Sequence, residues 1–207
     1  VWRSHKFAWK TPKTWTPLLT AWLRPHFQRD GLARLKPGFH RDIYIDDPEW
    51  SRILGDCVEP DLEWLEEKLG DALKPSTLRT YHGCRTDDAG EYFRNGIRAH
   101  DRREMIKKLN STIESINELS RIKPQIQKRI PKFESKIDIG RLFVCVDDTS
   151  LLDDAAHYLI YGSEWITAVL GPYGRRSLLT IGTPTLLEVD LPLKLTNATT
   201  RKHFAAL

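Results

Sequence analysis

Apolar residues recur along this chain with the two periods of regular secondary structure, and the pattern changes near residue 76. Before that point, helical spacing is clearest in residues 61–69, where Leu62, Leu65 and Leu69 share one face. Gly70 follows and is expected to end this helix. Prolines interrupt the rest of this region and predict short helices joined by turns, at Pro12, Pro17, Pro25, Pro37 and Pro48.

After residue 76, strand patterns alternate with helical ones. Residues 78–82 predict a strand, and residues 86–96 predict a turn followed by a short capped helix. A longer helix is predicted at about residues 100–122, because its apolar side chains recur at helical spacing. Pro124 and Pro131 are expected to break the chain after it.

Three further elements follow towards the C-terminus. Residues 141–147 form a continuous apolar run of strand length, which indicates a strand buried in the core. A helix with one apolar stripe is predicted at about residues 153–170. Residues 185–193 alternate between apolar and polar, with Glu188 on the polar face, and Pro192 indicates that this strand ends there or lies at an edge.

These elements predict an α+β fold in two parts. Residues 1–75 form a mainly helical N-terminal region that holds six of the seven tryptophans, which we expect to serve as its core. Residues 76–207 form a mixed domain of strands and helices. The length of 207 residues allows one sizeable domain with an accessory region.

Composition narrows the class of protein. Hydrophobic residues make up 40% and charged residues 29%, as in globular proteins. No run approaches the roughly 18 apolar residues of a membrane helix, so we expect no membrane partner. The three cysteines are scattered without a CxxC pair, which favours a reducing cytoplasm and predicts no metal site.

Charge is unevenly distributed. Residues 1–41 hold nine Lys/Arg and one acidic residue, whereas residues 42–75 hold three and eleven. Residues 94–136 hold twelve Lys/Arg and five Asp/Glu, a net charge of +7. This stretch suits an anionic partner such as RNA or DNA, although a solvated helix surface would show the same composition.

The candidate chemistry begins at Tyr81-His82-Gly83-Cys84-Arg85, followed by a helix that closes with Gly96-Ile97. This segment resembles the first motif of the ADP-ribosyltransferase superfamily, in its diphtheria-toxin-like and poly(ADP-ribose)-polymerase-like branch, where a strand ends in His-Gly. The order of later elements extends the resemblance over about residues 76–195. It implies a split antiparallel sheet core and NAD as substrate. Residues 1–75 resemble no family.

The resemblance also implies roles for individual residues. His82 would hydrogen-bond the adenosine-side ribose of NAD, and the backbone of Gly83 would meet the nicotinamide amide. Their chemistry agrees, since a ring nitrogen pairs with a hydroxyl and glycine permits close approach. The alternative is a purely structural role, in which His82 is a hydrogen-bonded histidine at the end of a strand and Gly83 is a turn glycine.

Further residues are candidates for the same site. Arg85 is a candidate partner for the pyrophosphate, because a guanidinium binds phosphate with two parallel hydrogen bonds. Tyr158 or Tyr161 would stack on the nicotinamide ring. Ser163 belongs to a polar cluster with Tyr161 and Glu164 and is a further candidate. Each also fits an ordinary structural role, as an exposed arginine, core tyrosines or a surface serine.

The reaction requires a carboxylate that stabilises the oxocarbenium-like ribose as nicotinamide leaves. The family carries this glutamate on a late strand, and the present sequence offers no clean equivalent. Glu164 and Glu188 are the two candidates, and a third possibility is a glutamate beyond residue 207. Cys84 near His82 also suggests a thiol hydrolase, which the alternation of side chains along a strand is expected to disfavour.

The leading hypothesis is therefore an NAD-dependent mono-ADP-ribosyltransferase that modifies a macromolecular acceptor, nucleic acid or protein. Such an enzyme would act as a toxin or antiviral effector in the cytoplasm, and an antitoxin or inhibitor protein would be a natural partner. The alternative is a non-catalytic nucleic-acid-binding or partner-binding module on a degenerate transferase scaffold. The missing late glutamate favours this alternative.

Overall fold

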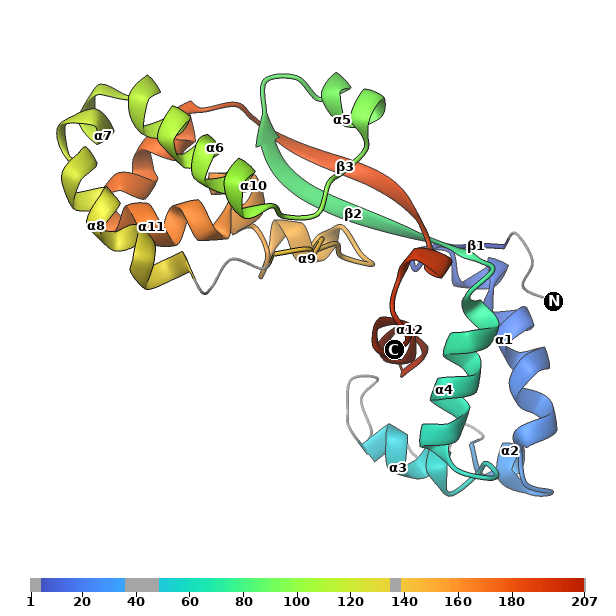
Figure 1. Ribbon diagram of the computed structural model, residues 1–207. Coiled ribbons are helices and arrows are strands. Elements are labelled where there is room, and N and C mark those ends of the chain that lie inside the picture. Colours follow the sequence, from blue (N-terminus) through green and yellow to red (C-terminus); the bar gives the residue numbers. More distant parts are fainter. Residues whose placement is uncertain (1–4, 36–48, 135–138, 207) are drawn as a thin grey trace. The chain divides into compact units, whose positions relative to one another are not determined.

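A computed structural model describes residues 5–35, 49–134 and 139–206 (Figure 1). The chain forms two compact units, one of residues 1–79 with 190–207 and one of residues 80–189. The C-terminal residues 190–207 thus belong with the N-terminal region rather than with the preceding mixed domain. Trp2 and the expected turns at Pro37 and Pro48 lie outside the described residues.

The first unit consists mainly of helices. Its α-helices are α1 (Thr16–Leu23), α2 (Gly31–Arg34), α3 (Glu49–Gly55), α4 (Leu62–Leu73) and α12 (Ala198–Ala206). Short 3-10 helices lie at Pro12–Thr14, Arg24–His26 and Leu193–Leu195. A two-residue strand, β1 (Lys6–Phe7), precedes them. The described part of this region therefore matches the expected short helices joined by turns.

Helix α4 confirms the pattern read from residues 61–69. The Asp61 side chain accepts a hydrogen bond from the Trp64 N–H at 2.8 Å and so caps the helix. Leu65 and Leu69 are buried. The helix does not end at Gly70: a Cβ there would lie 3.1 Å from the backbone of Arg201, so this glycine lets α12 approach closely.

The tryptophans do not form the core of the first unit. None of the described ones in this region is buried, and Trp9 and Trp64 are exposed. Trp9 stacks on Trp15 with 5.9 Å between ring centroids, and His26 lies 5.6 Å from Trp64. Smaller residues fill the interior instead, namely Phe7, Ile53, Cys57, Val58, Leu65, Leu69, Leu73, Leu78 and Leu193.

The sheet is mixed and three-stranded, in the order β1-β2-β3, and two of its strands, β2 (Thr77–Thr86) and β3 (Thr183–Pro192), have ten residues. Strand β1 runs parallel to β2 and pairs Lys6 with Thr77. The alternation predicted for β3 is confirmed: Leu187 is buried, Glu188 is exposed, and the strand ends at Pro192 at the sheet edge. The fold is α+β, as predicted.

The second unit has an apolar core built mainly from helices. Its helices are α5 (Gly90–Asn95), α6 (Arg102–Ser115), α7 (Asn117–Arg121), α8 (Lys123–Glu134), α9 (Thr149–Leu152), α10 (His157–Tyr161), α11 (Glu164–Gly174) and a 3-10 helix, Arg175–Thr180. The buried cluster comes mainly from α6, α7, α8 and α11 (Figure 1): Leu109, Ile113, Leu119, Ile126, Trp165, Ile166, Val169, Leu170 and Leu178.

The helix expected at residues 100–122 is present but divided. Ile116 has an extended backbone and separates α6 from α7. The prediction that Pro124 and Pro131 break the chain is wrong, because both lie within α8. Pro124 occupies the first turn, where a helix needs no proline N–H, whereas Pro131 costs one backbone hydrogen bond that burial of the adjacent helix face offsets.

Residues 141–147 do not form a buried strand. Only Cys145 pairs with β2, through two 2.8 Å hydrogen bonds between its backbone and that of Tyr81. Phe143 is 42% exposed. A central strand needs a ladder of hydrogen bonds to the sheet, and here a single bridge joins the segment to β2.

The helix expected at residues 153–170 is interrupted by Gly162. This residue adopts φ +80°, ends α10 and gives way to α11, which begins at Glu164. Gly171, at φ +71°, bends the chain inside α11. Left-handed backbone of this kind favours glycine, so two glycines set the limits of a continuous apolar stripe.

Gly182 provides a stability prediction. At φ +61°, a Cβ on this residue would lie 2.9 Å from the backbone N of Thr86. Gly140 has a similar φ of +73° with open space around it. We expect Gly182→Ala to lower the free energy of unfolding by about 3 kcal/mol and Gly140→Ala by about 1 kcal/mol in urea titrations. Equal losses would show that the contact with Thr86 carries no cost.

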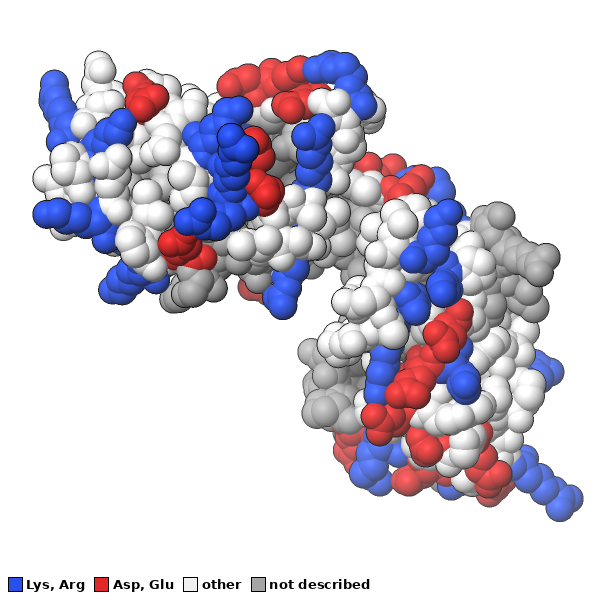
Figure 2. Space-filling view, in the orientation of Figure 1, with Lys and Arg blue, Asp and Glu red and all other residues white. Residues whose placement is uncertain are grey.

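No helix within the described residues is both long and apolar enough to cross a membrane. On the second unit, Figure 2 shows Lys and Arg side chains spread over the face that carries α6, α7 and α8. Some of these cations are paired, such as Arg102 with Glu134 and Lys123 with Glu114. The excess of positive charge read from residues 94–136 is thus displayed on the surface.

Candidate functional site

A large cleft lies within the second unit, with a volume of about 1080 Å³. Its walls come from β2, from α5 and the connection to α6, from the first turns of α6, and from the turn between α10 and α11. Five of the eight predicted site residues line it: His82, Arg85, Tyr158, Ser163 and Glu164. Gly83, Tyr161 and Glu188 do not.

His82 lies in the middle of β2 rather than at its end. Its Nδ1 is 3.0 Å from the carbonyl oxygen of Phe143, and because a carbonyl only accepts, Nδ1 carries the proton. Burial lowers the pKa of His82 below its usual value; the hydrogen bond to Phe143 opposes this, and His100 and Lys108 add to the lowering. The ring is therefore neutral at pH 7, and Nε2 is a hydrogen-bond acceptor.

Gly83 faces away from the cleft. A Cβ at this position would lie 3.0 Å from Leu151 and 3.3 Å from the Cβ of Tyr158. Its missing side chain therefore lets α9 and α10 pack against β2. Neighbouring residues of a strand point to opposite faces, which explains why His82 and Gly83 do not share one surface. The predicted contact of Gly83 with nicotinamide has no support from this placement.

Glu164 is held at the start of α11. The Ser163 hydroxyl accepts a hydrogen bond from the Ile166 N–H at 3.4 Å and so caps the helix. The Tyr158 hydroxyl donates to Glu164 Oε2 at 3.2 Å, and His157 Nε2 lies 3.9 Å from the same oxygen. A carboxylate in the first turn of a helix is favoured by the helix dipole. The carboxylate remains accessible from the cleft.

Tyr161 and Glu188, which were also predicted as site residues, lie outside the cleft. Tyr161 packs against the buried cluster, and the guanidinium of Arg175 lies 5.6 Å from its ring centroid. Glu188 is exposed on β3. Tyr158 is thus the candidate for a ligand contact among the two tyrosines, and Glu164 the candidate carboxylate among the two glutamates.

Arg85 has a structural use that the sequence did not indicate. Its guanidinium donates to five backbone carbonyls at 2.7–3.3 Å, those of Leu159, Ile160, Leu179, Ile181 and Gly182. These contacts engage the five N–H groups that an arginine side chain possesses. The role predicted for Arg85, pairing with a pyrophosphate, would require breaking some of them.

Cys84 and Tyr92 also line the cleft and were not predicted as a pair. The two side chains share a hydrogen bond, and burial is the main cause that raises the pKa of each above its usual value. His82 and Cys84 are two residues apart on β2, so their side chains lie on the same face of the strand. The expectation that the alternation of side chains disfavours a Cys84–His82 pair is therefore wrong. The raised thiol pKa argues against a thiol hydrolase instead, because the nucleophile is the thiolate.

The charged residues of the cleft carry both signs. Arg98, Arg103 and Lys108 line it together with five carboxylates, at Asp87, Glu91, Asp101, Glu104 and Glu164. Within the described part of the chain, no group of three or more His, Cys, Asp or Glu residues is placed to hold a metal ion.

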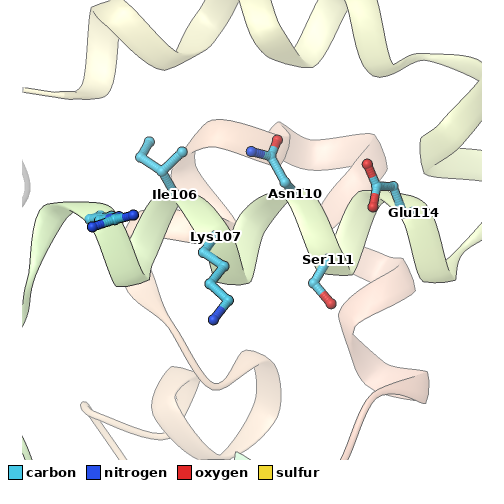
Figure 3. A pocket seen from close by; sticks show the side chains of 6 residues that line it. Ile106, Lys107, Asn110, Ser111 and Glu114 are labelled. Carbon is cyan, nitrogen blue, oxygen red and sulfur yellow. The ribbon is translucent and has the colours of Figure 1, made fainter.

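A second hollow, of about 430 Å³, runs along α6 alone. Figure 3 shows that Ile106, Asn110 and Glu114 point to one side of the helix and Lys107 and Ser111 to the other. Side chains that diverge from one helix cannot surround a ligand. This groove is ordinary helix surface.

Comparison with known proteins does not assign the chain to a family. No family model, no curated protein and no solved structure matches it.

Proposed function

We propose that the chain is an NAD-dependent mono-ADP-ribosyltransferase whose active site is the cleft of the second unit. One observation carries the proposal: His82, an acceptor at Nε2, and Glu164, a carboxylate oriented by Tyr158, line the same cleft. Its volume of about 1080 Å³ is ample for a dinucleotide. On this proposal, β2 and β3 correspond to strands of the split transferase sheet.

In the proposed transfer of ADP-ribose, Glu164, His82 and Tyr158 have separate roles. The glycosidic C–N bond of NAD breaks, and nicotinamide leaves with the bonding electron pair. Glu164 stabilises the positive charge that develops on the ribose, and His82 accepts a hydrogen bond from a ribose hydroxyl. The acceptor forms a bond to the ribose C1′ and loses its proton to the Glu164 carboxylate. Tyr158 positions that carboxylate through the hydrogen bond at 3.2 Å.

The acceptor on this proposal is nucleic acid. The cationic face over α6, α7 and α8 (Figure 2) would attract a polyanion to the unit that carries the cleft. A protein acceptor would be the outcome if only polypeptides became labelled. Such an activity in the cytoplasm fits a toxin or antiviral effector, restrained by an inhibitor protein.

The direct test is release of nicotinamide from NAD, measured by chromatography with single-stranded DNA, with RNA and with protein extract. We expect release that increases with a nucleic acid acceptor. His82→Ala is expected to reduce it by about tenfold, since one hydrogen bond of about 1 to 1.5 kcal/mol is lost. The control is His203→Ala, because His203 is exposed on α12 of the other unit.

A second candidate function is a non-catalytic nucleic-acid-binding module, which the cationic face over α6, α7 and α8 favours. It predicts salt-dependent binding of nucleic acid without nicotinamide release under any condition. Binding without turnover in the same assay would replace the transferase proposal with this one.

A further inference from the structure

One corner of the cleft brings together three nitrogen-bearing side chains from three segments. His82 comes from β2, His100 from the connection between α5 and α6, and Lys108 from α6. The His100 ring lies 6.2 Å from that of Phe143, whose carbonyl accepts the hydrogen bond from His82. The backbone of His100 is held in both directions, by a 3.0 Å hydrogen bond to Arg141 and a 2.8 Å hydrogen bond from Gly140.

Lys108 is the cation of this corner, and five carboxylates line the same cleft. Lys108 forms no ion pair with another described residue, although Glu104 lies one helical turn before it on the cleft wall. His100 and Lys108 both act to lower the pKa of His82. Lys108 also acts on the Cys84 thiol. An ammonium group without a carboxylate partner among the described residues attracts an anion.

We propose that Lys108 and His100 form a phosphate subsite that binds a phosphate of the dinucleotide while His82 binds an adjacent sugar hydroxyl. The inference rests on the proposed function and names the residues that hold the anionic part of its substrate. The ammonium group and a protonated or N–H-bearing imidazole donate to phosphate oxygens.

The protonation of His82 supports the division of roles. With Nδ1–H donated to Phe143, a neutral ring offers only a lone pair at Nε2, which repels a phosphate oxygen and accepts from a hydroxyl. A ligand that satisfies the corner therefore carries a hydroxyl next to a phosphate, as a 5′-phosphorylated ribose does. Arg85 cannot fill the phosphate role without giving up its carbonyl contacts.

Lys107 and Lys108 provide a matched pair of variants. They are consecutive exposed lysines of α6, and only Lys108 lines the cleft, whereas Lys107 lies in the shallow groove of Figure 3. Calorimetric titrations with inorganic pyrophosphate and with ADP-ribose are the measurement. We expect Lys108→Met to weaken both by about tenfold, Lys108→Arg to restore most of the affinity, and Lys107→Met to leave it near the unmodified value.

Equal weakening by Lys107→Met and Lys108→Met would overturn the subsite, because a general surface field would then explain the binding. Absence of pyrophosphate and ADP-ribose binding to the unmodified protein would overturn it as well. Nicotinamide release that survives Lys108→Met with an unchanged KM for NAD would reject the subsite and leave the transferase intact. Selective loss of pyrophosphate binding without any nicotinamide release would support the subsite and reject the transferase.

Discussion

Replacing Arg85 with leucine is expected to lower the free energy of unfolding by about 4 kcal/mol, because it leaves five backbone carbonyls without their donor. Two of these, Leu159 and Ile160, belong to the last turn of α10, whose carbonyls have no partner within the helix. The others end the 3-10 helix and precede β3. One side chain thus joins two helix ends to β2. Urea unfolding gives the measurement through its midpoint and slope.

Two further variants test the reason for this loss. Arg85→Lys keeps the charge but offers three donors from one point, so we expect about half the loss. Arg98→Leu removes an exposed arginine of the same cleft and should change stability by less than about 0.5 kcal/mol. If Arg85→Leu were as mild as Arg98→Leu, water would have to satisfy the carbonyls equally well, and Arg85 would be available to a ligand.

Helices and strands whose formation depends on residues close in the sequence were predictable from the sequence. Helix α4 has its capping Asp61 and its apolar face within residues 61–73, and β3 alternates regularly from Leu187 to Leu191. Gly96 closes α5 at φ +70°, as expected of a glycine after a short helix. In these cases the local pattern and the tertiary packing favour the same structure.

The predictions of secondary structure were wrong where a residue distant in the sequence determines the local structure. The apolar stripe expected to continue through residues 153–170 stops at Gly162, where a Cβ would lie 3.1 Å from the Cβ of Arg85. Nothing within that segment indicates the contact with β2. Likewise, residues 141–147 have the composition of a buried strand but pair with the sheet only through the bridge between Cys145 and Tyr81. Periodicity records which face is apolar and not which partner covers it.

The candidate site was predictable in part for the same reason. His82, Tyr158 and Glu164 line one cleft, whereas Gly83, Tyr161 and Glu188 do not. The opposite directions of His82 and Gly83 follow from the period of two along a strand, a rule that also places Cys84 beside His82. No sequence pattern around Lys108 predicts that it lines the cleft, because its position depends on how α6 packs beside β2.

Glu164→Gln is expected to reduce nicotinamide release by about 100-fold or more, because an amide neither stabilises an oxocarbenium ion nor accepts the acceptor's proton. The amide keeps the size of the side chain and can still accept the hydrogen bond from Tyr158, so folding should be unaffected. Tyr158→Phe removes that hydrogen bond and leaves the carboxylate charged. We expect a smaller loss, about fivefold to tenfold, mainly in kcat.

Two glutamates outside the cleft complete the test by the same chromatographic assay. Glu118→Gln, on the exposed side of α7, is the neutral control. Glu188→Gln should also keep near-normal release, because Glu188 lies on β3 away from the cleft lining. If Glu188→Gln abolished release and Glu164→Gln did not, the catalytic carboxylate would be on β3, and the cleft beside α11 would be only the binding site. Loss with Glu164→Gln alone would instead mean that a carboxylate at the start of a helix performs the reaction, with the helix dipole opposing its protonation until the acceptor supplies the proton.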